Sequence, residues 1–210
     1  MDPAEVRRDL IVVGASAGGV SALLALCAQL PADLPAAVLI VLHIGTHTSV
    51  LPALLTSRGN DRAVHAEHGQ RIEPGTLYLA PPDHHMLVED GRIRLTRGPK
   101  EHHTRPAIDP LFRTAALDYG PRTIGVVLTG RLDDGTAGLQ AIKDRGGLAV
   151  VQDPADAEHP SMPRSALQSV RVDGCVPLAE LGQTLARWLQ APTPVAAESR
   201  VRDSWRANRR

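Results

Sequence analysis

Short apolar runs recur along the chain, and segments with helical spacing of their apolar residues lie between them. The runs are rich in Val and Ile and are apolar at consecutive positions, which is typical of strands covered by helices on both faces. Gly or Pro closes most of the helical segments. The predicted strands span residues 10–13, 38–42, 124–128 and 148–151, and the predicted helices span residues 18–30, 50–57, 106–117, 135–145, 163–169 and 178–189.

This alternation predicts an α/β fold with a doubly wound, mostly parallel, Rossmann-like sheet. The pattern changes between residues 67 and 100. In that region residues 78–80 and 85–95 have strand character, and Asp90-Gly91 inside the second stretch is typical of a tight hairpin turn. We therefore expect an antiparallel hairpin insertion that flanks the main sheet.

The length of 210 residues favours one domain, which we place over residues 1–190. The remainder contains two Pro and five Arg and has no apolar periodicity. Residues 191–210 are therefore predicted to form a basic, flexible tail.

Composition argues against several classes of protein. The chain has one Phe, two Tyr and two Trp, which are few aromatic rings for base stacking. Its 23 basic residues are balanced by 23 acidic residues, so it has no net charge to attract nucleic acid. No nucleic-acid partner is therefore expected. The sequence has no secretory stretch and no span of transmembrane length, which predicts no membrane insertion and a cytoplasmic location. Cys27 and Cys175 are isolated, which predicts two buried thiols rather than a disulfide or a zinc site.

The sharpest local motif is Gly14-Ala15-Ser16-Ala17-Gly18-Gly19, between the first predicted strand and the first predicted helix. At such an elbow, small neighbours relieve crowding, and the oxygen of Ser16 projects above the strand near the amides of the helix. Such exposure is what a nucleophile needs, but the motif taken alone is ambiguous. Two other interpretations stay open, namely a simple tight turn and a loop that binds a phosphate or a dinucleotide.

Two polar residues follow other predicted strands. His43 comes after the second strand, where a dinucleotide site would normally have an acidic residue, and from there it can serve as a base for Ser16. Asp134 follows the strand at residues 124–128 and can hold that histidine in the required tautomer. Taken singly, His43 can be structural, and Asp133 or Asp134 can be a helix N-cap.

Together these features resemble the chemotaxis receptor methylesterase family, CheB, and the similarity to its catalytic domain runs from about residue 10 to about residue 189. The matching segments are Gly14 to Gly19, His43, Tyr78-Leu79-Ala80-Pro81, His85, Arg105-Pro106 with Asp109 and Leu111-Phe112, Leu128-Thr129-Gly130 with Asp134-Gly135, and Gln152-Asp153-Pro154 before Met162-Pro163-Arg164.

The resemblance implies that Ser16 is the nucleophile, His43 the general base and Asp134 the acid of a catalytic triad, with no metal and no cofactor. It implies hydrolysis of glutamyl methyl esters with release of methanol, and deamidation of receptor glutamines as a second activity. The implied partner is a methyl-accepting, chemotaxis-type receptor, and the functional counterpart is a receptor methyltransferase.

The chain also departs from the family pattern. Ile44-Gly45 replaces the usual Met-Pro after the histidine, and Arg131-Leu132 replaces Met-Gly, so a different substrate groove is expected. Arg131 either meets an acidic receptor segment or points into solvent. The family's receiver domain is not expected, because the first strand begins within about ten residues of Met1. This leaves constitutive activity, control in trans by a receiver-domain regulator, or a pathway other than chemotaxis.

Competing hypotheses come from several classes. A generic α/β-hydrolase-like esterase would use Ser16, Asp134 and His159 in that chain order, although its elbow would normally come after several strands. A nucleotide-binding module and a non-catalytic receptor-binding module are the alternatives without catalysis. Metal binding is not favoured by the spacing of the nine histidines, although we expect His85 to support the site.

Overall fold

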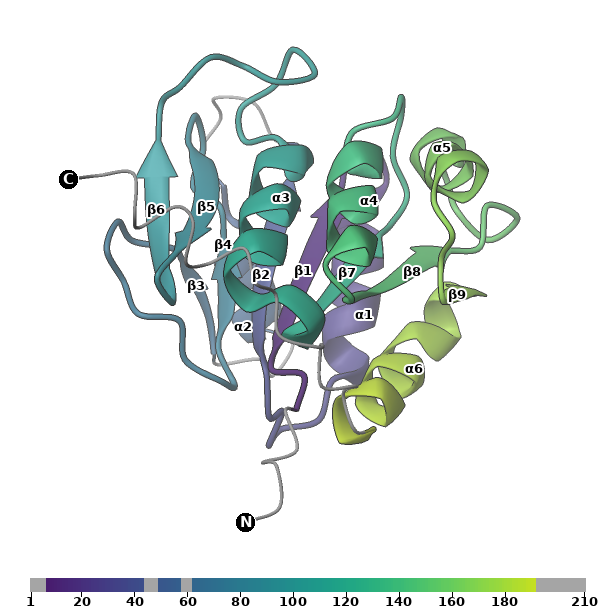
Figure 1. Cartoon of the computed structure of the whole chain (residues 1–210), viewed down its shortest axis with the longest axis horizontal. Coiled ribbons are helices and arrows are strands. Elements are labelled where there is room, and N and C mark those ends of the chain that lie inside the picture. The colour runs from purple at the N-terminus through teal and green to yellow at the C-terminus, as the bar shows by residue number, and fades with distance from the viewer. Residues whose placement is uncertain (1–6, 44–48, 58–61, 192–210) are drawn as a thin grey trace, which may run out of the picture.

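Seven parallel strands form the central sheet of the protein, a computed structural model in which residues 7–43, 49–57 and 62–191 are described (Figure 1). Their order across the sheet is β3-β4-β2-β1-β7-β8-β9. The strands are β1 (Leu10–Ala15), β2 (Ala37–Leu42), β3 (Ala63–His65), β4 (Leu77–Leu79), β7 (Thr123–Val127), β8 (Leu148–Gln152) and β9 (Gly174–Val176).

Helices cover both faces of this sheet, because alternate residues of each central strand point to opposite sides. Leu10 and Val12 of β1 contribute to a core beneath α3 (Ile108–Tyr119), α4 (Thr136–Asp144) and α5 (Ser161–Ser169). Ile11 and Val13 contribute to a second core. This second core lies beneath α1 (Gly19–Gln29), α2 (Leu51–Ser57) and α6 (Leu178–Gln190), while a short 3₁₀ helix, Gly120–Arg122, follows α3.

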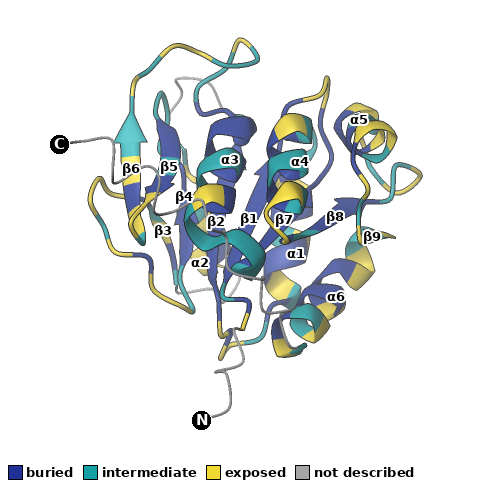
Figure 2. Cartoon of the chain, viewed as in Figure 1, coloured by how far each residue is buried: buried dark blue, intermediate teal, exposed yellow. Residues whose placement is uncertain are grey.

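The central strands are buried along their whole length (Figure 2). This explains why they are apolar at consecutive positions and do not alternate between apolar and polar residues. The predicted doubly wound, mostly parallel sheet is confirmed.

The predicted hairpin is also present. β5 (His85–Glu89) and β6 (Arg92–Thr96) pair antiparallel, and both Asp90 and Gly91 have positive φ, 52° and 69°. Positive φ at both central residues is the requirement of the type I′ turn that suits a twisted hairpin. The amide of Gly91 donates to the Asp118 carboxylate at 2.8 Å, which attaches the turn to α3.

The assignment of residues 78–80 to this insertion was wrong. The strand β4 pairs parallel with both β2 and β3 in the main sheet, and Tyr78 is 1 % exposed. The strands β3 and β9 were not predicted. Each has only three residues and lies at an edge of the sheet, so neither produces the continuous apolar run that marks the central strands.

Three strands end together at one edge of the sheet, and this positions the site. Ala15 at the end of β1 lies opposite Leu42 at the end of β2, and Gly14 lies opposite Val127 at the end of β7. The backbone pairing continues past the strands, since the amide of Ser16 donates to the Thr129 carbonyl at 3.0 Å. The residues that follow these strands are therefore held side by side.

Other sequence-based expectations have mixed outcomes. Cys27 is buried, and burial raises the pKa of its thiol to about 12, but Cys175 is exposed on the edge strand β9, contrary to expectation. Within the described part of the chain, no helix combines the length and apolar character needed to cross a bilayer. The tail predicted for residues 191–210 lies outside the described residues except for its first position, so it stays a prediction.

The close packing of α6 on α1 gives the first testable prediction. A Cβ added at Gly182 would lie 2.3 Å from Cβ of Gln29, an approach that the helices relieve only by moving apart. We expect Gly182→Ala to lower the free energy of unfolding by about 1–3 kcal/mol, because overpacking outweighs the gain in helix propensity of at most about 1 kcal/mol.

Urea unfolding monitored by circular dichroism measures this change. Gln183→Ala, at the exposed neighbouring position of the same helix, is the control and should change stability by less than about 0.5 kcal/mol. A Gly182→Ala protein more stable than wild type would contradict the packing argument.

Candidate active site

Ser16 lies at the turn between β1 and α1, where the chain has little room for side chains. Gly18 has a φ of 75°, and a Cβ there would lie 2.8 Å from a carboxylate oxygen of Glu158. A Cβ at Gly19 would lie 2.6 Å from Cδ1 of Leu42. The glycines thus allow the sharp turn that leaves Ser16 partly exposed at the start of α1.

His43 links Ser16 to Asp134. Its Nδ1 lies 3.1 Å from Oγ of Ser16, and its Nε2 lies 2.8 Å from Oδ2 of Asp134. Because an ionised carboxylate only accepts hydrogen bonds, Nε2 carries the proton and Nδ1 is free to accept the proton of the serine hydroxyl. The ring is therefore in the tautomer that a general base for Ser16 requires.

The carboxylate of Asp134 is almost fully buried, with 1 % exposure, and is held by the start of α3. The amide of Ile108 donates to Oδ2 at 2.7 Å, and the amide of Asp109 donates to Oδ1 at 3.0 Å. Burial disfavours the charge, but the hydrogen bonds from His43 and from these amides outweigh it and hold the pKa of Asp134 below its ordinary value. The side chain thus caps α3 and orients the histidine at once.

The loop after β7 is fixed against the serine turn. Thr129 donates from its hydroxyl to the carbonyl of Ala17 at 3.0 Å, and its amide donates to Oε1 of Gln152 at 2.9 Å. A Cβ added at Gly130 would lie 2.1 Å from Sδ of Met162 and 2.9 Å from Cβ of Ser16. Only glycine lets this loop approach the serine so closely.

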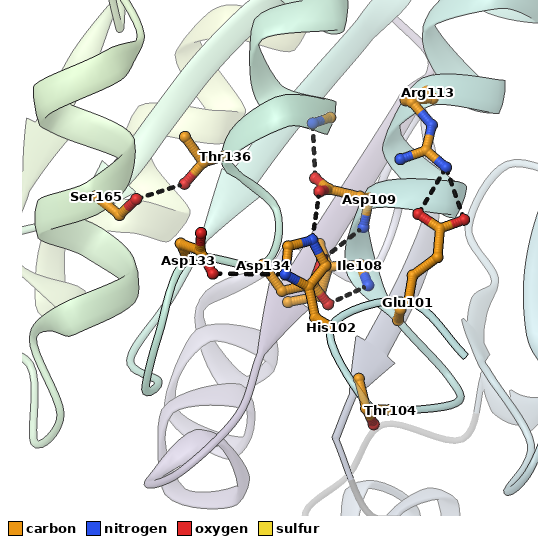
Figure 3. Close-up of polar contacts among 12 residues, drawn as sticks. Glu101, His102, Thr104, Ile108, Asp109, Arg113, Asp133, Asp134, Thr136 and Ser165 are labelled. Carbon is orange, nitrogen blue, oxygen red and sulfur yellow. Dashed lines mark hydrogen bonds and ion pairs between the residues drawn. The ribbon is translucent and has the colours of Figure 1, made fainter. Parts of the chain in front are cut away.

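A second histidine lies behind Asp134, and sequence reasoning missed it. Nε2 of His102 lies 2.9 Å from Oδ2 of Asp109 and 3.7 Å from Oδ1 of Asp134, and its Nδ1 lies 3.4 Å from Asp133 (Figure 3). In the sequence it is only one of nine histidines whose spacing does not favour metal binding. Its backbone has a φ of 50°, and no sequence pattern indicates a left-handed residue that turns an imidazole inward.

Three of these four side chains are the one group among the described residues with the geometry of a metal site. The ligand atoms of His102, Asp109 and Asp134 lie within 4.8 Å of one another. These carboxylates already accept hydrogen bonds from His43, His102 and the backbone, including the amide of Gly138 at 2.7 Å from Asp109 Oδ1. The hydrogen-bonding needs of these carboxylates are thus met by protein donors.

Two other histidines named from the sequence also have defined places. His85 is buried and joins the carbonyl of Pro99, at 2.9 Å from Nε2, to the amide of Ala107, at 3.2 Å from Nδ1. It therefore braces the loop that leads into α3, in line with the expected supporting role. The ring of His159 lies 3.6 Å from Glu158, and His43 rather than His159 lies between Ser16 and Asp134.

A serine, a histidine and a buried aspartate thus lie in hydrogen-bonded sequence at the carboxyl edge of a parallel sheet, an arrangement typical of the class of α/β proteins that carry out acyl transfer. The comparisons with known proteins agree with this class. The family model described as CheB methylesterase matches residues 11–185. The chain belongs to the CheB methylesterase family.

Relatives and a solved structure support the assignment. A Leptospira interrogans protein, provisionally named a protein-glutamate methylesterase/protein-glutamine glutaminase, is 39 % identical over 181 residues, covering 85 % of this chain and 94 % of the relative. The protein-glutamate methylesterase FrzG of Myxococcus xanthus is 36 % identical over 86 % of this chain, which spans only 54 % of it. The crystal structure of the Thermotoga maritima CheB methylesterase catalytic domain superposes with a TM-score of 0.81 and 30 % identity, covering 87 % of this chain and 99 % of that domain.

Ile44-Gly45 and Arg131-Leu132 are the two departures from the family pattern. Ile44-Gly45 lies outside the described residues. Arg131 and Leu132 are both exposed, and Leu132 is 67 % exposed with a φ of 66°. An exposed apolar side chain on a strained backbone, two residues after Gly130, makes this loop different from one with glycine at that position.

The depressed pKa of Asp134 gives the second prediction. A carboxyl group with a lowered folded-state pKa stabilises the fold above its unfolded pKa of about 3.9, and this contribution is lost as the pH falls through the folded-state value. Asp134→Asn removes that ionisation. The free energy of unfolding should therefore fall less between about pH 5 and about pH 3 in this variant than in wild type.

Near neutral pH the same variant should be about 1–3 kcal/mol less stable, because an asparagine amide cannot accept all the hydrogen bonds that the carboxylate accepts. Chemical unfolding at a series of pH values measures both effects. Asp133→Asn, at the exposed neighbouring position, is the matched control. Parallel stability curves for wild type and Asp134→Asn would refute the assignment of an ionised Asp134.

Proposed function

We propose that this protein is a serine hydrolase that removes methyl esters from glutamyl side chains of chemotaxis-type receptors. The observation that carries the proposal is the continuous contact from Ser16 through His43 to Asp134, at 3.1 and 2.8 Å. The family membership supports the ester substrate, because several relatives are named as protein-glutamate methylesterases.

The three side chains have different tasks in the reaction. Oγ of Ser16 attacks the carbonyl carbon of the glutamyl ester while Nδ1 of His43 accepts the hydroxyl proton. The imidazolium then gives this proton to the departing methoxide oxygen, so methanol leaves and an acyl-serine remains. Water attacks the acyl group with His43 again as base, which releases the glutamate carboxylate and restores Ser16. Asp134 keeps its charge throughout and stabilises the imidazolium.

The turn after Ser16 is suited to stabilise the oxyanion that forms in these steps. The positive end of the α1 dipole lies at this turn, and the amide that follows a nucleophile at such an elbow is a standard oxyanion donor. That amide belongs to Ala17, whose carbonyl is held by the hydroxyl of Thr129. We assign the amide of Ala17 as one donor and the amide of Arg131 as the second, because the amide of Gly130 already donates to the carbonyl of His159 at 2.8 Å.

The proposed partner is a methyl-accepting receptor, and a receptor methyltransferase supplies its methyl esters. The exposed Arg131 and Leu132 at the rim would contact the polypeptide around the esterified residue. Deamidation of receptor glutamines is proposed as a second activity. It follows the same acyl-serine route with ammonia as leaving group, and the name of the Leptospira relative includes protein-glutamine glutaminase.

The third prediction tests the nucleophile. The purified protein is incubated with receptors methylated by a matching methyltransferase, and the released methanol is measured. We expect Ser16→Ala to reduce turnover to near background, because the residue that carries the acyl group is lost. Ser165→Ala is the control, since its hydroxyl accepts a hydrogen bond from Thr136, the first residue of α4, and does not contact His43. Equal methanol release from wild type and Ser16→Ala would falsify the proposed function.

The fourth prediction separates two histidines. His43→Ala should lower kcat by about 10³-fold or more, since a triad without its base retains only binding and oxyanion stabilisation. His159→Ala should retain most of the activity, because its ring contacts Glu158 at 3.6 Å and neither Ser16 nor Asp134. The reverse result would support an α/β-hydrolase-like arrangement that uses His159 as base.

A further inference from the structure

The mechanism above leaves a buried carboxylate unused directly beside the triad. Asp109 is 2 % exposed, on the first turn of α3, and it accepts hydrogen bonds from the amide of Gly138 at 2.7 Å and from His102 at 2.9 Å. Its own amide donates to Asp134. The buried carboxylates of Asp109 and Asp134 thus both lie at the first turn of α3. Their negative charges repel each other unless a positive charge lies nearby.

His102 is the side chain placed to supply that charge. Figure 3 shows its ring directed at the start of α3, with Asp109 and Asp134 on one side and Asp133 on the other. Burial disfavours its charged form, but the bond to Asp109 and the charges of Asp134, Asp109 and Asp133 together raise the pKa of His102. The other charges nearby, Glu101 and Arg113, are paired with each other at 2.8 Å and add little net field.

Resting on the proposed function, we propose that His102 is a positioning residue: as an imidazolium it neutralises Asp109, so that Asp134 is the uncompensated carboxylate that faces His43. His43 then pairs with Asp134, and His102 pairs with the neighbouring Asp109. One pair, His43 with Asp134, takes part in the reaction. The other pair, His102 with Asp109, sets the electrostatic potential at the first pair.

The arrangement has a direct consequence for the base. Without the positive charge of His102, the negative potential at Asp134 and Asp109 increases, and protons bind more tightly to groups inside it. Asp109 is the first such group, because burial already raises the pKa of its carboxyl, as does the charge of Asp134. His43 is the second, through its bond of 2.8 Å to Asp134. A base that holds its proton more tightly is inactive up to a higher pH.

The experiment compares His102→Gln with His103→Gln. Both residues have left-handed backbones, with φ of 50° and 60°, so both substitutions carry the same backbone strain, but His103 is exposed and outside the cluster. Glutamine keeps a neutral donor near the position of Nε2 and removes the charge. NMR titration follows the His43 ring and the Asp109 carboxyl, and neither signal needs a substrate.

In His102→Gln we expect the pKa of Asp109 to rise by about one unit or more and that of His43 by about half a unit, as for carboxylates and imidazoles that lose a neighbouring opposite charge. His103→Gln should change neither value. In the double variant His102→Gln/Asp109→Asn, which removes both charges of the pair, the pKa of His43 should return to near its wild-type value. Unchanged titrations of both groups in a folded His102→Gln protein would overturn the proposal, as would equal shifts in His103→Gln.

Methanol release from methylated receptor supplies the second readout. The acid limb of the pH profile of kcat should move to higher pH in His102→Gln. At a pH well above this limb, kcat should differ from the wild-type value by less than about threefold. A merely structural role would lower kcat by the same factor at every pH. Methanol release that persists in Ser16→Ala would refute the proposed hydrolase function. An unshifted acid limb in His102→Gln, with Ser16 still essential, would refute only the role of His102.

Discussion

A carboxylate can be buried only where donors replace its water, and the donors that Asp134 finds come from two other parts of the chain. The amides of Ile108 and Asp109 bring the start of α3 to it, and the imidazole of His43 brings the end of β2. Satisfying this one charge therefore fixes the helix, the loop after β7 and the histidine relative to one another. The alignment of Ser16 with His43 depends on this fixation.

The sheet brings these groups into range because its parallel strands end at a common edge, and small residues let the layers meet there. A Cβ at Gly14 would lie 2.4 Å from Cγ2 of Ile108, so glycine at this position of β1 is what allows the start of α3 to lie over the strand. Gly130 does the same for the loop beside Ser16. The site is thus held by close backbone approach as well as by its polar contacts.

Much of this was predictable from the sequence, and the failures have physical causes. Central strands buried on both faces and amphipathic helices produce strong periodic signals, so the doubly wound sheet was predicted and is confirmed. The structure also brings Ser16, His43 and Asp134 together, while their catalytic roles stay a prediction. Sequence reasoning misplaced β4 because a three-residue strand has no period to detect. It missed His102 because a left-handed loop, and not a repeating pattern, turns that ring toward Asp109.

The order of the three contacting residues along the chain has a consequence for protein synthesis. Ser16 and His43 are 27 residues apart, but Asp134 follows His43 by another 91. A chain emerging from the ribosome carries its hydroxyl and imidazole long before the acid is made, and β7 must insert beside β1 before the three can meet. The three side chains can therefore come into contact only after the residues up to Asp134 have been made and β7 has paired with β1.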